Sequence, residues 1–331
     1  MERKKKRIVY VAVLLFLLSA CGKESPTSVP GTVYTTAITE TVTESPATES
    51  GTNSQSTEAG SNSSATGAVT ESPSAEADTN SSVTESVTDS LTTETATENV
   101  EPRSVAMTLA TYNIKHGADG LDRIAEAIRE ISPDIIGLEE VDVNCERSGY
   151  VDEPAELARL AGYSYYAFAK AISLGDGEYG TAILSRYPID SFDIISLESG
   201  NGEDRSLGHA VVFVDGLKVD AFVTHLSYQS SSLRITQMET IAGQLAGCEH
   251  YVVMGDFNSF NLEDIFHLGG DYYVNRPDRS YITFRRRDMA IDNIVVSKSF
   301  TELSSGVSEK EGSDHKLLYA AFQLSGIPVL Q

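Results

Sequence analysis

Residues 251–258 read Tyr-Val-Val-Met-Gly-Asp-Phe-Asn. The first four are apolar and include two valines, which is typical of a buried β-strand. Two polar side chains, Asp256 and Asn258, follow this strand at once. A rigid sheet holds the side chains of its loops in register, so polar residues at the end of an apolar strand indicate a functional site.

Polar residues also stand at the ends of other predicted strands. They are Asn113 (strand 107–114), Glu139 and Glu140 (135–141), His225 (219–226), Asp292 (291–296), and Asp314 and His315, which precede the last strand (317–324). Because sites in α/β folds form at strand ends, we expect these side chains to contribute to one site.

Helices and further strands complete the predicted domain. Helices are predicted at residues 121–131, 154–161 and 232–246. The first has apolar residues at helical spacing and is ended by Pro133. Four more strands are predicted at residues 163–171, 181–187, 193–197 and 209–214. Many strands and few helices predict an α/β protein in which helices pack on a sheet with a second sheet behind it.

The polar residues suit one kind of chemistry. Carboxylates together with an Asn side chain are hard oxygen ligands, which suit Mg²⁺, Mn²⁺ or Ca²⁺ better than zinc. Histidines beside carboxylates can carry protons near neutral pH. The sequence contains no Gly-x-Ser-x-Gly elbow, P-loop or His-Glu-x-x-His motif. Hydrolysis of a phosphoester by a metal-activated water is therefore favoured over acyl transfer.

Seven short motifs make a family resemblance specific. In chain order they read Thr-Tyr-Asn-Ile-Lys-His-Gly (111–117), Pro-Asp-Ile-Ile-Gly-Leu-Glu-Glu-Val-Asp (133–142), Tyr-Gly-Thr-Ala-Ile-Leu-Ser-Arg (179–186), Thr-His-Leu (224–226), Gly-Asp-Phe-Asn (255–258), Ile-Asp-Asn-Ile (291–294) and Ser-Asp-His (313–315). With them, residues 107–324 resemble the endonuclease/exonuclease/phosphatase (DNase I-like) superfamily. The resemblance implies a four-layer α/β/β/α sandwich with two packed, mainly antiparallel sheets.

The resemblance also implies a metal centre. Glu140 stands where the family has the Glu of a Gln-Glu pair and would be the principal metal ligand, with Asn113 assisting. Glu139 replaces the common Gln. Asp314 would be a further metal ligand or a brace for the site. The implied cation is Mg²⁺, with Mn²⁺ and Ca²⁺ as alternatives.

The remaining motif residues receive catalytic roles from the same resemblance. Asp256 and His315 would orient or deprotonate the attacking water, and which of them is the base stays open. Asp292 would fix the ring of His315. Asn258 would contact the phosphoryl oxygens, and His225 would lie near the leaving group as an acid or a hydrogen-bond donor.

Two further residues are weaker candidates for substrate binding. Tyr179 would line the substrate cleft, or it simply packs beside its strand. Arg205 resembles a family arginine that braces the site, but an ordinary surface arginine fits the sequence as well.

The first 21 residues predict an export signal with a lipid anchor. A basic run at residues 3–7 precedes an apolar stretch at 8–18 that is short for a membrane span. The sequence Leu-Ser-Ala-Cys-Gly at 18–22 resembles the bacterial lipobox, which implies cleavage before Cys21 and lipidation of that residue. The alternative is an uncleaved anchor helix with an incidental cysteine.

The amino-acid composition divides the chain after residue 21 into a linker and a folded domain. Residues 22–102 are dominated by Ser, Thr, Glu, Ala and Val without apolar periodicity, which predicts a disordered linker that carries the domain away from the membrane. The catalytic domain is predicted at 103–327.

The net charge of the predicted domain argues against general binding of nucleic acid. Of the total of −23, residues 1–21 carry +4 and residues 22–101 carry −12, so the domain carries −15. Such a domain lacks the basic surface with which proteins bind nucleic acid generally, so a nucleic-acid substrate would have to be held locally.

We therefore expect a monomeric, divalent-metal-dependent phosphoester hydrolase, exported and lipid-anchored to the outer face of the bacterial cytoplasmic membrane. Its substrate could be a nucleic acid, a phospholipid head group or a small phosphoester. The alternative is a catalytically inactive surface-binding lipoprotein with the same fold.

Overall fold

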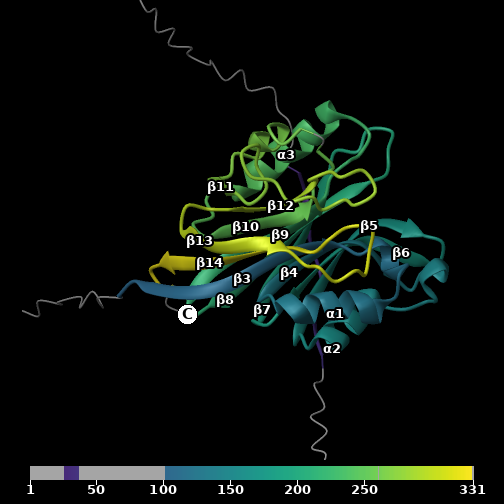
Figure 1. Cartoon of the computed structure of the whole chain (residues 1–331), viewed down its shortest axis with the longest axis horizontal. Helices are drawn as coiled ribbons and strands as arrows, with labels where there is room; N and C mark the ends of the chain where they lie inside the picture. The colour runs from purple at the N-terminus through teal and green to yellow at the C-terminus, as the bar shows by residue number, and fades with distance from the viewer. Residues whose placement is uncertain (1–25, 37–100, 260, 330–331) are drawn as a thin grey trace, which may run out of the picture. The chain divides into compact units, whose positions relative to one another are not determined.

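The computed structural model describes residues 26–36, 101–259 and 261–329 (Figure 1). Within them, two seven-stranded sheets pack on each other. The first sheet contains, in spatial order, β1 (Ser28–Pro30), β7 (Ile189–Leu197), β8 (Arg205–Val214), β9 (Leu217–His225), β10 (Tyr251–Asp256), β12 (Asp292–Val296) and β11 (Tyr272–Tyr273). The second contains β13 (Phe300–Val307), β14 (Leu318–Gly326), β3 (Arg103–Asn113), β4 (Ile135–Val143), β6 (Gly177–Ser185), β5 (Tyr165–Leu174) and β2 (Val33–Thr35).

Most strand pairs are antiparallel. Only β9 with β10, and β3 with β4, run parallel among the paired strands of the described residues. The predicted mainly antiparallel sheets are therefore confirmed.

Helices cover the outer face of each sheet (Figure 1). They are α1 (Leu121–Ile131), α2 (Glu153–Ala161) and α3 (Ser231–Leu245), and short 3-10 turns are η1 (Lys115–Gly117), η2 (Glu146–Ser148) and η3 (Asp264–Leu268). Successive side chains of β10 point to opposite faces of the first sheet. Met254 packs in the apolar cluster between the two sheets, and Val253 packs in the cluster beneath α3. Ile128 of α1 lies in a third apolar cluster, against the second sheet. The predicted four-layer sandwich is confirmed.

The helix boundaries follow from local sequence signals. α1 ends where Ser132 adopts a left-handed φ of 55°, directly before Pro133. The carboxylate of Asp152 caps α2 by accepting a hydrogen bond from the backbone N–H of Ala155 at 3.0 Å. All three predicted helices are present within about two residues of their predicted ends, the usual uncertainty of helix boundaries.

Some strands differ from the prediction. β7 and β8 each begin four residues before the predicted strands at 193 and 209. β13 was not predicted, because its central residues Thr301 to Gly306 are polar or glycine apart from Leu303, which is exposed. An edge strand of this kind buries too little apolar surface to leave a pattern in the sequence.

The prediction of a disordered linker is wrong for residues 26–36. β1 pairs with β7 of the first sheet and β2 pairs with β5 of the second, so this segment, here called the N-terminal strap, joins both sheets. Without the strap, β5 and β7 would be edge strands with unpaired backbone groups. The strap was not predicted because its short Ser-Val-Pro-Gly-Thr-Val-Tyr-Thr sequence has the same Ser-, Thr- and Val-rich composition as the linker around it.

Side-chain contacts explain why this stretch is ordered. Gly31 donates a backbone hydrogen bond to the carbonyl of Phe192 at 2.7 Å, and a Cβ at Gly31 would collide with the Phe192 ring. Val33 packs on the apolar cluster between the sheets. Tyr34 stacks on Tyr166 with ring centroids 4.8 Å apart.

The predicted signal peptide, Cys21 and residues 37–100 of the linker lie outside the described residues. No helix in the part of the chain that the structure describes is long and apolar enough to cross a membrane.

Candidate active site

The ends of the two parallel strand pairs bring the predicted residues together. Asn113 at the end of β3 is paired with Glu139 of β4. His225 at the end of β9 is paired with Asp256 at the end of β10, and Asp256 is also opposite Asp292, the first residue of β12. Because β10 contacts both β3 and β4, the two pairs end next to each other.

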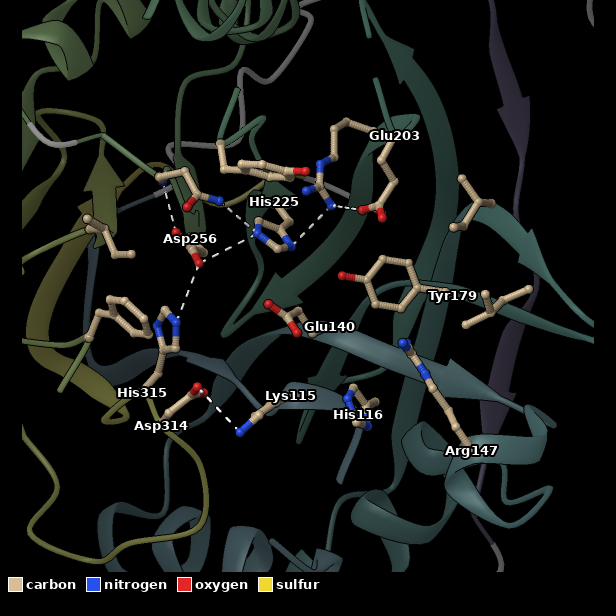
Figure 2. A pocket seen from close by; sticks show the side chains of 17 residues that line it. Lys115, His116, Glu140, Arg147, Tyr179, Glu203, His225, Asp256, Asp314 and His315 are labelled. Atoms are coloured by element: carbon tan, nitrogen blue, oxygen red, sulfur yellow. Dashed lines mark hydrogen bonds and ion pairs between the residues drawn. The ribbon is translucent and has the colours of Figure 1, made fainter. Parts of the chain in front are cut away.

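These strand ends surround a cavity of about 450 Å³ (Figure 2). Eight of the ten predicted catalytic, metal-binding and substrate-binding residues line it: Glu140, Tyr179, Arg205, His225, Asp256, Asn258, Asp314 and His315. Asn113 and Asp292 lie behind the wall and are hydrogen-bonded to lining residues. The structure thus gathers all ten in one place.

His315 and Asp292 form a buried pair. The Nδ1 atom of His315 lies 2.9 Å from Oδ2 of Asp292, which leaves Nε2 facing Oδ2 of Asp256 at 3.8 Å. Burial alone would lower the pKa of His315, but the charges of Asp292, Asp256 and Glu140 outweigh it and raise the pKa to about 9. The His315 ring is therefore a cation and a hydrogen-bond donor at neutral pH.

Asp256 occupies the centre of the site. Its Oδ1 accepts a hydrogen bond from the backbone N–H of Asn258 at 2.8 Å, and its Oδ2 accepts one from Nδ2 of Asn113 at 3.1 Å. The same Asn113 amide donates to Oε1 of Glu140 at 3.0 Å. Burial and the neighbouring Asp292 raise the pKa of Asp256 above the usual carboxyl range, so Asp256 can accept a proton near neutral pH.

A β-bulge directs Glu140 into the cavity. Between Leu138 and Val141, two residues of β4 oppose one residue of β6. Glu140 adopts a left-handed φ of 55°, a conformation that residues other than glycine seldom adopt. The bulge therefore places Glu140 at the cavity and its neighbour Glu139 in the interior, where Glu139 is fully buried.

The surroundings of Glu139 favour its protonated form. Its Oε1 accepts a hydrogen bond from the hydroxyl of Thr111 at 2.8 Å. Burial, and then the charges of Asp292, Asp256 and Glu140, raise the pKa of Glu139 well above its usual value. A protonated Glu has the shape of Gln, so the raised pKa brings Glu139 closer to the Gln that is common at this place in the family motif.

A second group lies around His225. The amide of Asn258 lies 2.9 Å from its Nε2, and Nη1 of Arg205 lies 3.4 Å from its Nδ1. Burial, with the positive charges of Arg205 and His315, holds the pKa of His225 well below its usual value. The imidazole is therefore neutral at neutral pH. Arg205 is buried and pairs with Glu203 at 2.6 Å, so it is not a surface arginine.

Tyr179 and Asp314 lie on opposite walls (Figure 2). Tyr179 is buried, and burial together with the charge of Glu140 raises the pKa of its hydroxyl, which stays protonated. Oδ2 of Asp314 lies 3.5 Å from Nζ of Lys115 and 3.1 Å from Nε of Arg286. A carboxylate already paired with two cations is better placed to brace the site than to bind a metal ion.

The donor set fits a divalent cation. Ligand atoms of Asp256, Asp292 and His315 lie within 4.8 Å of one another, but His315 is protonated and hydrogen-bonded to Asp292, so the carboxylate oxygens of Glu140 and Asp256 at the cavity are the ones open to a cation. Asp292 already raises the pKa of Asp256, and a bound cation would relieve this repulsion. Oxygen-rich sites of this kind suit Mg²⁺, Mn²⁺ or Ca²⁺.

Several cavity residues were not predicted. Lys115 and His116 lie within the motif 111–117 and could have been found there; both have left-handed φ values, of 51° and 42°. Such strained backbone is typical of functional sites. Arg147 and Phe284, whose ring lies 4.8 Å from that of His315, come from connecting segments that carry no recognisable pattern.

Comparison with known proteins agrees with this geometry. Residues 110–315 match the model of the Endonuclease/Exonuclease/phosphatase family. The chain is 24% identical over 177 residues to the uncharacterized protein YbhP of Escherichia coli, covering 48% of this chain and 70% of that one.

Solved structures share the fold. An endonuclease/exonuclease/phosphatase from Beutenbergia cavernae has a TM-score of 0.57 at 23% identity, covering 68% of this chain and 73% of that one. Truncated TDP2 of Caenorhabditis elegans has a TM-score of 0.52 at 20% identity, covering 66% and 97%. Because the family match spans more than half of its residues, the chain belongs to the endonuclease/exonuclease/phosphatase family.

Proposed function

We propose that this protein is a divalent-metal-dependent phosphoester hydrolase that uses an activated water. The observation that carries the proposal is the arrangement of the buried His315–Asp292 pair, Asp256 and Glu140 around one cavity. A cation bound by Glu140, with Asn113 behind it, would neutralise charge on a phosphoryl oxygen. Mg²⁺ is the proposed ion, and Mn²⁺ and Ca²⁺ are the alternatives to test.

Asp256 is the base that the pKa values of the two candidates favour. His315 is already protonated at neutral pH because its pKa is raised to about 9, whereas Asp256 can still take up a proton. In the proposed step, Asp256 accepts a proton from the attacking water as the new oxygen–phosphorus bond forms. His315 donates a hydrogen bond from Nε2 to a phosphoryl oxygen and stabilises its developing charge.

The group around His225 would assist departure of the leaving group. As the bond from phosphorus to the leaving oxygen breaks, that oxygen would take a proton from a second water, and the proton held by Asp256 would neutralise the hydroxide that remains. The neutral imidazole of His225 would donate a hydrogen bond to the leaving oxygen from Nε2 once the substrate replaces the Asn258 amide at that nitrogen. The amide of Asn258 holds the His225 ring and lies beside Asp256. Arg205 adds positive charge behind His225.

We also propose that the protein is exported and anchored at the outer face of the cytoplasmic membrane through a lipidated Cys21. The basic run, the short apolar stretch and the lipobox-like sequence at residues 18–22 support this location. Only six residues separate Cys21 from Ser28 of the strap, and a chain of that length reaches about 25 Å when fully extended. The strap would therefore keep the catalytic domain close to the membrane.

Hydrolysis of bis-p-nitrophenyl phosphate and of p-nitrophenyl phosphate tests the proposed chemistry. We expect turnover that EDTA abolishes and Mg²⁺ restores, and that His315→Ala lowers at least 100-fold, the usual contribution of a catalytic proton-transfer or charge-stabilising group. His267→Ala is the matched control, because His267 is exposed and does not line the cavity. Turnover that survives EDTA, or that is equal in both variants, would contradict the proposal.

A further inference from the structure

The outer part of the same cavity contains a second, separately built cationic position. Arg147 belongs to η2, which follows β4. Its Nε and Nη2 donate hydrogen bonds to Oδ2 and Oδ1 of Asp142 at 2.8 and 2.7 Å. Asp142 is fully buried on β4, two residues after Glu140. A buried carboxylate thus fixes one edge of the guanidinium group.

The other edge of Arg147 is free. Its Nη1 atom makes no hydrogen bond or ion pair with any described residue, and the side chain is 42% exposed. The Cζ atom lies 5.3 Å from the centre of the Tyr179 ring, which supports the plane of the guanidinium group. In Figure 2, Glu140 lies between His315 and Arg147, and all three line the cavity.

We propose that Arg147 binds a second anionic group of the substrate, at a distance from the phosphoryl group that is cleaved. This inference rests on the proposed hydrolase function and names its substrate class: a small phosphoester that carries a further phosphate or carboxylate. The free edge of a fixed guanidinium group offers two N–H donors, which suit either anion. Ile172 and Leu174 of β5 line the cavity as well and give the uncharged part of the substrate an apolar surface.

The surrounding charges favour a small substrate over a long nucleic acid. Of the Lys and Arg side chains that line the cavity, Lys115 pairs with Asp314 and Arg205 with Glu203, whereas the pair of Arg147 with Asp142 leaves the Nη1 atom of Arg147 without a partner among the described residues. A track of free cations, which a polyanion needs along its backbone, is therefore missing among the residues that line the cavity. Arg147 is a single position, and it fits a single additional anion.

Competition against the hydrolysis of bis-p-nitrophenyl phosphate tests this inference. Fructose 1-phosphate and fructose 1,6-bisphosphate differ only in the second phosphate, and their inhibition constants would be measured for the wild type and for Arg147→Gln. We expect the bisphosphate to bind about 10- to 100-fold more tightly than the monophosphate, the usual effect of a charge-assisted hydrogen bond, and Arg147→Gln to abolish this ratio. Arg147→Lys, which keeps the charge without the planar fork, should restore part of it.

Controls separate binding from a structural role. Arg159→Gln removes an exposed arginine that pairs with Glu156 and does not line this cavity, so the ratio should persist. If Arg147 only neutralises Asp142, its variants will lower the melting temperature and leave the ratio unchanged, which would overturn the inference. If the chromogenic substrate is not hydrolysed at all, the proposed function itself fails.

A third comparison identifies the source of the anion. A thymidine dinucleotide and a tetranucleotide differ in the number of neighbouring phosphodiesters. If the tetranucleotide shows an Arg147-dependent advantage and the bisphosphate does not, the second anion is a nucleic-acid phosphate, and the small-substrate assignment is wrong. An advantage confined to the bisphosphate supports it.

Discussion

Glu139 and Glu140 are adjacent in the chain but have opposite environments. The bulge in β4 directs Glu140 to the cavity and buries Glu139 next to Thr111. Burial and three nearby carboxylates raise the pKa of Glu139 well above its usual value and so favour its protonated form. The two glutamates therefore serve different purposes: Glu140 faces the cavity, and Glu139 is a buried hydrogen-bond partner of Thr111.

Glu139→Gln should consequently retain activity, because it keeps the shape and charge of the protonated side chain. In metal-free protein, its stability relative to wild type should increase with pH. The raised pKa means that Glu139 stabilises the fold fully below its unfolded pKa of about 4.3 and progressively less as the pH rises towards its folded pKa. Urea unfolding of both proteins in EDTA at pH 5 and pH 8 measures this difference. A stability difference that does not change between the two pH values would show that Glu139 is ionised.

Asp256 and His315 predict a bell-shaped dependence of kcat/KM on pH. Activity should rise as Asp256 becomes ionised, at a pH above the usual carboxyl range, because only the carboxylate can accept the proton of water. Activity should fall as the pH passes about 9, where His315 loses its proton and its positive charge. Rates measured from pH 5 to 10 at saturating Mg²⁺ test this assignment. A profile that instead rises with loss of the His315 proton would make His315 the base.

The N-terminal strap shows how a short element can complete both sheets. Its two strands pair with β7 and β5, and Gly31 between them leaves no room for a side chain beside Phe192. Gly31→Val should lower the free energy of unfolding by about 1–3 kcal/mol, the usual cost of overpacking. Thr32→Val, which adds the same residue at the next, exposed position, serves as the control. Equal urea midpoints for both variants would show that the strap contributes no stability.

How far each element could be predicted depends on how it buries apolar surface. α1 was predicted with its boundaries because its apolar spacing is regular and Pro133 follows it. β10 was predicted because its apolar residues are buried on both faces. β13 and the strap were missed, since strands at sheet edges take part through backbone hydrogen bonds, which leave no trace in the sequence.

The residues of the candidate site could be predicted for a related reason. Its ten predicted residues stand in motifs at strand ends, so the sheets bring them together. Arg147 could not be predicted, because its position depends on a hydrogen bond to buried Asp142 rather than on a motif. The ionisation of Glu139 also required the structure, since it follows from burial.

At the level of the whole molecule, the strap changes the expected role of residues 37–100. This segment follows Thr36 and precedes Glu101, and both of these residues belong to the same folded unit. It therefore cannot act as the spacer between Cys21 and the domain while the strap is in place.

A protease site inserted near residue 70 tests this arrangement in the full, membrane-attached chain. After cleavage, the catalytic domain should stay with the membrane fraction in the wild type, because the strap still binds it. In Gly31→Val a larger share should be released. Immediate release of the wild-type domain would show that the linker is the only connection, and a protein that is soluble before cleavage would contradict the lipid anchor.

The most direct test of the proposed function is phosphodiester hydrolysis as a function of Mg²⁺ in the wild type, Glu140→Gln and His315→Gln. We predict saturable activation of the wild type, a requirement for more Mg²⁺ in Glu140→Gln, and a kcat at least 100-fold lower in His315→Gln that added Mg²⁺ does not restore. Glu249→Gln, an exposed position, controls for the substitution itself. Activity independent of Mg²⁺, or wild-type turnover in both site variants, would contradict the assignment of this cavity as a metal-dependent phosphoesterase site.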